Sequence, residues 1–505
     1  MLEGNKIKVA QGDNSCYLLL DQANRHGLIA GASGTGKTVT LKVLAEGFSK
    51  AGVPVFMADV KGDVTGMAEA GEASDSVVER AKELGAEGWT PEGCTVHEWN
   101  MLEGEGIPCR ITISDMGPEL LGRMLGLTDV QQGVLKIAFR VADDNGMLLI
   151  DLKDLRAMLA YLNDHAKEIE GTYGRVSTQS IGAIQRALLT IEDQGADVFF
   201  GEPALEIEDW MVCDENGQGV VNILDAAKLI SSPQVYAMFL LWMLTELYEN
   251  LPEVGDPDKP KFVFFFDEAH LLFDNMPKEL TDKIVQTVKL IRSKGVGLYF
   301  ITQSPSDIPD EVLAQLSNRI QHGLRAYTPK EQKAVKAAAQ AFRENPAFNS
   351  VEALQEVGTG EALVSFLNEN GQPEIVERAK VLPPQCKMAA ATPETMTAVY
   401  AAQSALMDKY GTAIDRESAY EMLSSKAEEE TTSKEDEAAA KKAAKEAEDA
   451  EAKAQKQAEK EAERAAKAQQ KQAEQITKTV SSIVGQIGRE AGRQLVRGLF
   501  GSLKK

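Results

Sequence analysis

The sequence predicts an α/β fold with a mainly parallel sheet, a helical insertion and a helical C-terminal extension. From Asn24 to about Pro384, short apolar runs alternate with longer stretches of helical periodicity, which is typical of parallel strands covered by helices. Between residues 117 and 193 the strand-like runs stop and helical periodicity continues alone. Beyond Pro384 the composition shifts to helix-forming residues, which predicts the C-terminal extension.

Five apolar runs are the predicted strands: Leu28–Ala30, Val53–Ala58, Val220–Leu224, Phe262–Phe266 and Leu298–Thr302. With 505 residues, the chain is long enough for more than one domain. The predicted organisation is a short N-terminal segment (1–25), an α/β core (26–116 and 194–385), a helical insertion (117–193), a C-terminal helical region (386–425), a charged arm (426–473) and an amphipathic tail (474–505).

The overall charge argues against one class of function. The formal net charge is −23, and the isoelectric point lies near 4.8. Such a surface repels nucleic acid on average, so the chain is not expected to coat DNA without specificity. Contact with a polyanion would need a locally basic channel or tail.

Cysteine content and apolar segments predict a cytoplasmic protein. The five cysteines are too few and too dispersed for a disulfide framework. Residues Met1–Ala10 lack the apolar core of a secretory signal. The most apolar helical run, Tyr236–Leu244, is far shorter than the roughly 20 residues that a membrane span needs.

A phosphate-binding loop is predicted at residues 31–38. The letters Gly-Ala-Ser-Gly-Thr-Gly-Lys-Thr fit the pattern G-x-x-x-x-G-K-[ST] and lie between a predicted strand and a predicted helix. Glycines let backbone N–H groups point at phosphates, and the helix N-terminus adds partial positive charge. Lys37 is expected to reach the terminal phosphates of ATP, and the Thr38 hydroxyl is an expected Mg²⁺ ligand. The predicted nucleotide-binding residues are Ser33, Gly34, Thr35, Gly36, Lys37, Thr38 and Val39.

A pair of carboxylates follows the most apolar predicted strand. Asp267 and Glu268 come directly after Phe262–Phe266. At the carboxyl end of a parallel strand, beside the phosphate loop, Asp267 is predicted to hold Mg²⁺ through a bound water and Glu268 to polarise the attacking water. Ala269 and His270 complete the letters D-E-A-H, but no second set of helicase motifs follows, so His270 is interpreted as a helix-start residue.

Two further side chains are candidate catalytic groups. Gln303 follows the strand Leu298–Thr302, where its amide would face the terminal phosphate or the attacking water, and the alternative is a structural role in a turn. Arg292 ends a predicted helix, so it is a candidate arginine finger for a neighbouring subunit. Its alternative role is that of a cation at a helix C-terminus. Arg319 and Arg325 compete for the finger role.

The arm and tail differ in character. Residues 426–473 have high helix propensity and no apolar seam, which favours a solvated single helix over a coiled coil. The tail has an apolar row beside a basic row, which predicts an amphipathic helix that packs on the protein's own body or another subunit, or docks on a partner or an acidic membrane surface. The apolar row is Ile483, Ile487, Ala491, Leu495 and Leu499, and the basic row is Arg489, Arg493 and Arg497.

Together these segments resemble the HerA branch of the HerA/FtsK ATPases. The resemblance rests on the phosphate loop, Asp59-Val-Lys-Gly-Asp63, Phe-Asp-Glu-Ala-His, and Ile-Arg-Ser-Lys-Gly followed by Thr-Gln-Ser-Pro. It covers about residues 24–384, and the helical stretch 120–162 with the Gly- and Arg-rich tail is similar to bacterial YjgR-type proteins.

The resemblance implies a RecA-like core, a hexameric ring with ATP sites between subunits and, in HerA itself, DNA translocation. By position it supports the roles given to Lys37, Thr38, Asp267, Glu268, Gln303 and Arg292, and it marks Asp59 as a carboxylate lining the site. The chain departs from HerA in two respects. Only about 25 residues precede the phosphate loop, too few for the small barrel domain of HerA-like translocases, and the overall charge is acidic.

Two functions follow from these expectations. The first is a ring-forming, Mg²⁺-dependent ATPase motor acting on DNA or another polymer, with Lys283, Lys289 and Lys294 as candidate channel charges. The second is a nucleotide-dependent switch or scaffold for a protein partner, suggested by the charged arm and tail. GTP specificity is not expected, because no N-K-x-D element follows the acid strand.

Overall fold

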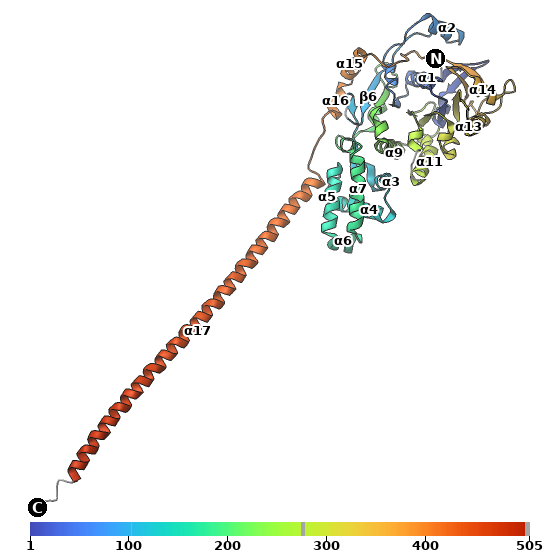
Figure 1. The fold of residues 1–505 in the computed structure, drawn as a ribbon. Helices are drawn as coiled ribbons and strands as arrows, with labels where there is room; N and C mark the ends of the chain where they lie inside the picture. The colour runs from blue at the N-terminus through green and yellow to red at the C-terminus, as the bar shows by residue number, and fades with distance from the viewer. Residues whose placement is uncertain (103, 274–277, 500–505) are drawn as a thin grey trace, which may run out of the picture. The chain divides into compact units, whose positions relative to one another are not determined.

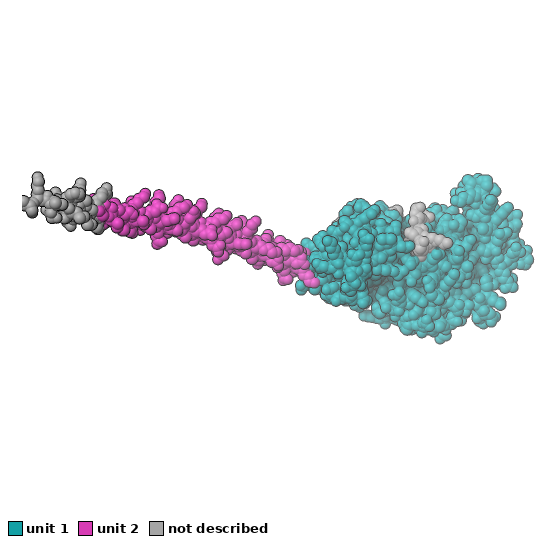
Figure 2. All heavy atoms as spheres, turned by 90° about the horizontal axis from the view of Figure 1, so that it is seen from below, with its two compact units in different colours: residues 1–423 teal, residues 424–505 magenta. Residues whose placement is uncertain are grey.

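The computed structural model describes residues 1–102, 104–273 and 278–499. Residues 1–423 form one compact unit, called the body below, and residues 424–505 form a second unit (Figure 2). The side chains of Ile487, Arg489, Ala491, Arg493, Leu495, Arg497 and Leu499, on which part of the tail prediction rests, lie outside the described part, as do residues 500–505.

One mixed sheet runs through the body, as Figure 1 shows. Its order in the described part of the chain is β1-β2-β13-β12-β11-β4-β10-β9-β5-β8-β6-β7, with β3 on β2. The pairs from β11 through β4, β10, β9, β5, β8 and β6 to β7 are parallel, and the remaining pairs are antiparallel. The strands are β1 (Leu2–Glu3), β2 (Lys6–Gln11), β3 (Ser15–Leu19), β4 (Gly27–Ala30), β5 (Val55–Asp59), β6 (Val96–Asn100), β7 (Ile107–Pro108), β8 (Val221–Asp225), β9 (Phe262–Phe266), β10 (Val296–Thr302), β11 (Asn318–His322), β12 (Glu361–Ser365) and β13 (Glu377–Val381).

The predicted α/β class is confirmed. The five predicted apolar runs correspond to β4, β5, β8, β9 and β10, and every residue of β4, β5, β9 and β10 is buried. Strands covered on both faces carry apolar residues throughout, which explains why they were visible as runs. The first 25 residues contribute three strands, and β2 joins them to the main sheet by pairing with β13.

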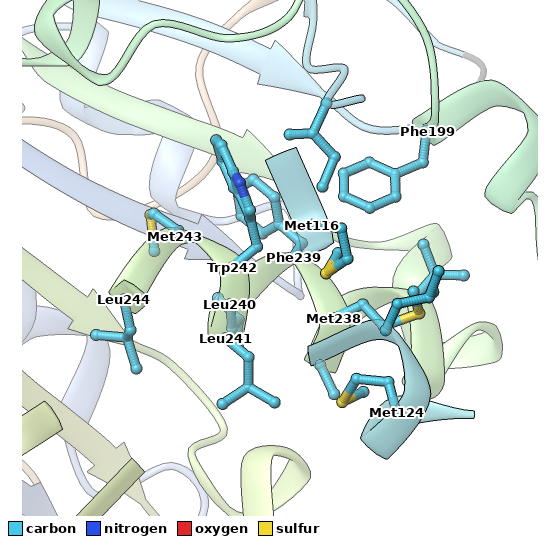
Figure 3. Packing of buried hydrophobic residues seen from close by; sticks show 14 of the residues in the cluster. Met116, Met124, Phe199, Met238, Phe239, Leu240, Leu241, Trp242, Met243 and Leu244 are labelled. Atoms are coloured by element: carbon cyan, nitrogen blue, oxygen red, sulfur yellow. The ribbon is translucent and has the colours of Figure 1, made fainter. Parts of the chain in front are cut away.

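Helices cover both faces of the sheet. On one face, α1 (Lys37–Lys50) packs in a core with side chains of β2, β5 and β10. On the other, α9 (Pro233–Asn250) is buried over most of its circumference, as expected of a helix that is apolar all round. Figure 3 shows its residues Met238, Phe239 and Trp242 packed among neighbours that include Met116 and Phe199.

Residues 113–199 fold as α3 (Ile113–Met124), α4 (Asp129–Asp144), α5 (Leu152–Asp164), α6 (Ala166–Tyr173), α7 (Thr178–Glu192) and α8 (Ala196–Phe199), where the helical insertion was predicted. Capping boxes at Thr112, Thr128 and Asp151 begin α3, α4 and α5, because each side chain accepts a hydrogen bond from a first-turn N–H. Further α-helices of the body are α2 (Asp75–Glu83), α10 (His270–Phe273), α11 (Lys278–Leu290), α12 (Asp310–Leu313), α13 (Pro329–Gln340) and α14 (Ser350–Glu356).

The segment after β13 is hydrogen-bonded to side chains of α1. Lys42, fully buried in α1, donates hydrogen bonds to the carbonyls of Asp63, Lys387 and Met388 at 2.7, 2.7 and 3.1 Å. Glu46, also buried, accepts from the backbone N–H groups of Gln385 and Cys386. The segment 385–388, called the strap below, leads into α15 (Pro393–Ala402) and α16 (Ser404–Tyr410).

The described residues of the second unit belong to one long helix, α17 (Ala419–Leu499), which continues without a break across the predicted arm–tail boundary at residue 474. All side chains from residue 425 to 484 are exposed, including Ile476, Val480, Ile483 and Val484. Ion pairs at i,i+4 spacing, such as Glu463–Lys467, support the helix locally. Among the described helices, none combines the length and apolar character needed to cross a membrane.

Candidate nucleotide-binding site

The parallel order of the central strands brings the predicted residues to one edge of the sheet. β4 lies between β10 and β11, and β9 and β5 follow on the other side of β10. Since parallel strands end at the same edge, the loop after β4, the carboxylates after β9, Gln303 after β10 and Asp59 at the end of β5 lie along that edge. The N–H of Gly31 donates to the carbonyl of Thr302 at 3.2 Å, which joins the loop to the end of β10.

The phosphate loop needs its glycines for two physical reasons. Gly34 and Gly36 have φ values of 75° and 114°, in the region that favours glycine. A Cβ on Gly31 would lie 2.5 Å from the Cβ of His322, so a side chain cannot be accommodated there. α1 begins at Lys37 without a side-chain cap, which leaves its first N–H groups available to an anion.

Lys37 is held inside the loop. Its Nζ donates to the carbonyls of Gly31 at 2.7 Å and Ala32 at 3.2 Å, and the residue is 7% exposed. Burial lowers the pKa of the Lys37 ammonium, and the nearby charge of Lys61 lowers it further. Thr38 and Val39 follow in the first turn and are partly buried, while Ser33 and Gly34 form the exposed tip. The site is thus rich in donors that a phosphate can accept from.

The pKa values of Asp267 and Glu268 are shifted in opposite directions. Burial raises the pKa of Asp267 to about 6, and the charge of Glu268 adds to this effect while Lys61 opposes it. Burial also acts to raise the pKa of Glu268, but the hydrogen bond and charge of Lys61, with His270 and Gln303, outweigh it and lower that pKa. Glu268 is one of the two non-glycine residues with positive φ among those described, at 47°, and its N–H donates to Asp267 Oδ1. Its backbone is therefore constrained into the left-handed region.

Lys61 is a site residue that the sequence interpretation missed. Its Nζ lies 2.8 Å from Oε1 of Glu268, and its side chain is 47% exposed. Asp59 fixes the loop that carries it, because its carboxylate accepts hydrogen bonds from the backbone N–H groups of Lys61, Gly62, Val64 and Thr65. Asp59 thus contributes by shaping this loop. The segment Asp59-Val-Lys-Gly-Asp63 contributes to the resemblance to HerA, but its sequence contains no signal for a partner as distant as Glu268.

Comparison with known proteins assigns the family. A family model described as "Helicase HerA-like C-terminal" matches residues 4–505. The chain belongs to this family.

Among curated relatives of this HerA-like chain are two proteins named DNA double-strand break repair helicase HerA. The one from Sulfolobus acidocaldarius is 21% identical over 354 residues, covering 68% of this chain and 63% of the relative. The one from Sulfurisphaera tokodaii is 27% identical over 156 residues, covering 30% of each. The chain therefore spans less than two thirds of the length of these relatives.

Solved structures resemble the HerA-like body in fold. The bacterial conjugative coupling protein TrwB in its unbound form has a TM-score of 0.51 at 16% identity, covering 76% of this chain and 90% of that one. TrwB in complex with the GTP analogue GDPNP has a TM-score of 0.51 at 15% identity, covering 74% and 89%. The likeness supports the P-loop ATPase fold; the similarity to YjgR-type proteins stays a prediction.

His270 and Gln303 complete the surroundings of Glu268. His270 begins α10, as the sequence predicted, and its Nδ1 lies 3.3 Å from Oε2 of Glu268. The Gln303 side chain is exposed at the end of β10 and hydrogen-bonds to the Glu268 carboxylate, which contributes to its lowered pKa. Both therefore act on the same carboxylate in this HerA-like chain.

His322 packs against Gly31 of the phosphate loop, and the sequence did not predict this role. Its Nε2 lies 2.8 Å from Thr40 Oγ1, and its Nδ1 lies 3.0 Å from the carbonyl of Glu361. Burial lowers its pKa to about 4, and the charge of Lys37 adds to this, so the imidazole is neutral near pH 7. A polar strand such as β11 gives no apolar run, which is why this position was not recognised.

The three candidate finger arginines lie in different places. Arg292 lies just before β10, at the edge of the sheet opposite Gln303, and its guanidinium is 2.6 Å from Asp256. The seven residues of β10 span about 23 Å, so the Arg292 backbone is far from its own phosphate loop. Arg319 donates to the carbonyls of Leu313 and Leu316. Arg325 is exposed two residues after Gly323, whose carbonyl accepts from Ala32 of the loop.

Proposed function

We propose that this HerA-like chain is a Mg²⁺-dependent ATP hydrolase. One observation carries the proposal. The phosphate loop after β4, which contains Lys37, and the buried Asp267–Glu268 pair after β9 lie at the same edge of the sheet, with only β10 between the two strands. The loop and α1 bind the phosphates, Lys37 leaves its two carbonyl partners to neutralise them, and Glu268 orients and polarises the attacking water. Gln303 assists at the terminal phosphate.

The residues present suit a magnesium ion. Asp267 is 8% exposed and has a pKa raised to about 6, so a nearby divalent cation would relieve the cost of its charge. Thr38 and Asp267 offer hard oxygen ligands, and Mg²⁺ usually takes one or two protein ligands together with phosphates and waters. Among the described residues no three His, Cys, Asp or Glu side chains gather as a metal cage, which fits an ion that arrives with the nucleotide. When bound, the ion would neutralise charge on the transferred phosphoryl group.

The direct test is steady-state phosphate release by the full chain. Release is expected with ATP and Mg²⁺, to disappear when EDTA removes the metal, and to fall at least about a hundredfold in Lys37→Ala because phosphate neutralisation is lost. ATP is expected to be preferred over GTP. Turnover that survives both EDTA and Lys37→Ala would exclude this site as its source.

We also propose that the chain forms a closed ring, a hexamer as the HerA resemblance implies, in which Arg292 acts in trans. Arg292 and the phosphate loop belong to opposite edges of the sheet, and a head-to-tail interface in a closed ring brings opposite faces of neighbouring subunits together. Arg292 would then exchange Asp256 for the phosphates of the next subunit. The exposed Arg325, which lies near the phosphate loop of its own subunit, is the alternative finger. Arg319 donates hydrogen bonds to two backbone carbonyls, which favours a structural role for it.

The proposed substrate of the motor is DNA or another polymer in the cytoplasm. Support comes from relatives named DNA double-strand break repair helicase, while the net charge of −23 requires a local basic path such as Lys283, Lys289 and Lys294. Stimulation of ATPase activity by duplex DNA that weakens with salt would support DNA. Without stimulation at low salt, a protein substrate becomes the better proposal.

A second candidate is a nucleotide-dependent switch or scaffold. It is favoured by α17, whose exposed side chains from residue 425 to 484 include an apolar group at 476–484. We propose that this tail docks on a subunit, a partner or an acidic membrane surface. Slow turnover combined with nucleotide-dependent retention of a partner would favour this function over a motor.

A further inference from the structure

We propose that Lys61 changes partners in the ATPase cycle, pairing with Glu268 before ATP binds, as in the structure, and with the terminal phosphate when ATP is bound. Its departure would free the Glu268 carboxylate to accept a hydrogen bond from the attacking water. Lys61 is then a sensor of the third phosphate as well as a positioning residue for Glu268. This inference rests on the proposed ATPase function.

In the structure, Lys37 and Lys61 are both bound to protein groups. Lys37 donates to two neutral carbonyls, and Lys61 lies 2.8 Å from Glu268 Oε1. A triphosphate carries more negative charge than either partner, and ammonium groups bind phosphate oxygens as compact point charges. Binding of ATP therefore favours exchange of partners at both lysines.

The two ammonium groups repel each other electrostatically. The charge of Lys61 is the second cause of the lowered pKa of Lys37, after burial, so each lies within the electrostatic field of the other. A phosphate held by Lys37 would relieve this repulsion. Lys61 also has the freedom to move, because its side chain is 47% exposed and has four rotatable carbon–carbon bonds beyond a backbone that Asp59 holds.

Glu268 is held by several contacts in this arrangement. Its Oε1 contacts Lys61, its Oε2 lies 3.3 Å from His270, and its backbone adopts a φ of 47°. An ammonium ion on a carboxylate fixes its direction and competes with water for its lone pairs. Release of Lys61 therefore makes one oxygen available without any movement of the strained backbone.

The test compares nucleotides that differ in the third phosphate. Affinities for Mg²⁺ with ADP, and for Mg²⁺ with a non-hydrolysable β,γ-imido analogue of ATP, are measured by calorimetry on the full chain. In Lys61→Ala, the analogue should bind about tenfold more weakly, the effect of one lost charge-assisted hydrogen bond, while ADP affinity stays unchanged. Lys61→Arg should retain most of the preference, and Lys82→Ala, which removes an exposed lysine of α2, should change neither affinity.

A double-mutant cycle tests the exchange itself. Glu268→Gln removes the competing partner, so analogue affinity should rise, and it should rise more in the chain with Lys61 than in Lys61→Ala. An equal rise in both backgrounds would overturn the exchange. Equal weakening of ADP and analogue in Lys61→Ala would show a merely structural lysine, and no weakening would exclude contact with the phosphate. If the unaltered chain binds neither nucleotide, the proposed function fails and this inference falls with it.

Discussion

At the scale of single residues, the site holds charges at an energetic cost. Asp267 is buried with a pKa of about 6, compared with about 3.9 for an unfolded aspartate. A raised carboxyl pKa means that the folded state favours the protonated form. The resulting destabilisation is fully present above about pH 6 and disappears as the pH falls below about 4.

Asp267→Asn should therefore stabilise the metal-free chain above pH 6. The expected gain in free energy of unfolding is about 3 kcal/mol, because the amide carries no charge to bury. Thermal unfolding at pH 7.5 in EDTA measures the gain, which should shrink as the pH is lowered toward 5. The same variant should lose the stabilisation that Mg²⁺ and ATP confer on the unaltered chain. A lower melting temperature at pH 7.5 would show that the charge is stabilised in the native state.

How far single residues could be predicted depended on whether their partners are local. Lys37 and Thr38 were recognisable because the phosphate loop is one continuous segment. Asp267 and Glu268 were recognisable because they end a buried apolar strand. Lys61 and His322 were not, because their roles arise from contacts with Glu268 and Thr40 across the fold.

At the scale of elements, apolar strands were predictable and polar ones were not. β6 has the sequence Val-His-Glu-Trp-Asn and β11 Asn-Arg-Ile-Gln-His, so neither forms an apolar run. Their polar groups are bonded within the fold: Asn100 donates to the carbonyls of Glu105 and Gly106, and Asn318 donates to those of Gln22 and His26. The partners of Asn318 are distant in sequence, so they are visible only once the chain is folded.

The hydrogen bonds between α1 and the strap can be tested by substitution of Lys42. Lys42→Met keeps the length of the side chain but removes the donor to three carbonyls of Asp63, Lys387 and Met388. Stability should fall by about 2–4 kcal/mol, because buried carbonyls lose their partner. Hydrogen exchange should accelerate at residues 385–388, while the control Lys82→Met on exposed α2 should leave it unchanged. Unaltered exchange in Lys42→Met would show that Glu46 alone holds the strap.

At the scale of the whole molecule, the body and the second unit should be separable. Residues 1–423 form one compact unit, and the side chains of residues 425–484 are exposed. A chain ending at Leu423 should therefore unfold within about 2 °C of the full chain, since little apolar area is lost. Calorimetry and far-ultraviolet circular dichroism measure this, with a loss of helical signal expected from removal of the arm. A much lower melting temperature would mean that the arm stabilises the body.

Assembly provides a separate prediction. If Arg292 completes the site of a neighbouring subunit, Arg292→Ala and Glu268→Gln chains should each be inactive alone and regain hydrolysis when mixed. At equal amounts, roughly a quarter of the interfaces in a closed ring would join an intact Glu268 to an intact Arg292. Recovery is measured as phosphate release after co-refolding or subunit exchange. Mixed rings without recovered activity would assign Arg292 to its ion pair with Asp256 alone.

The measurement that bears most directly on the central claim separates ATP binding from ATP turnover in Glu268→Gln. The account predicts that this variant binds Mg²⁺ and ATP at least as tightly as the unaltered chain, because the loop, Lys37 and Asp267 remain. Its phosphate release should fall at least about a hundredfold, because water is no longer polarised. Unchanged turnover in Glu268→Gln, with binding intact, would contradict the assignment of the catalytic site.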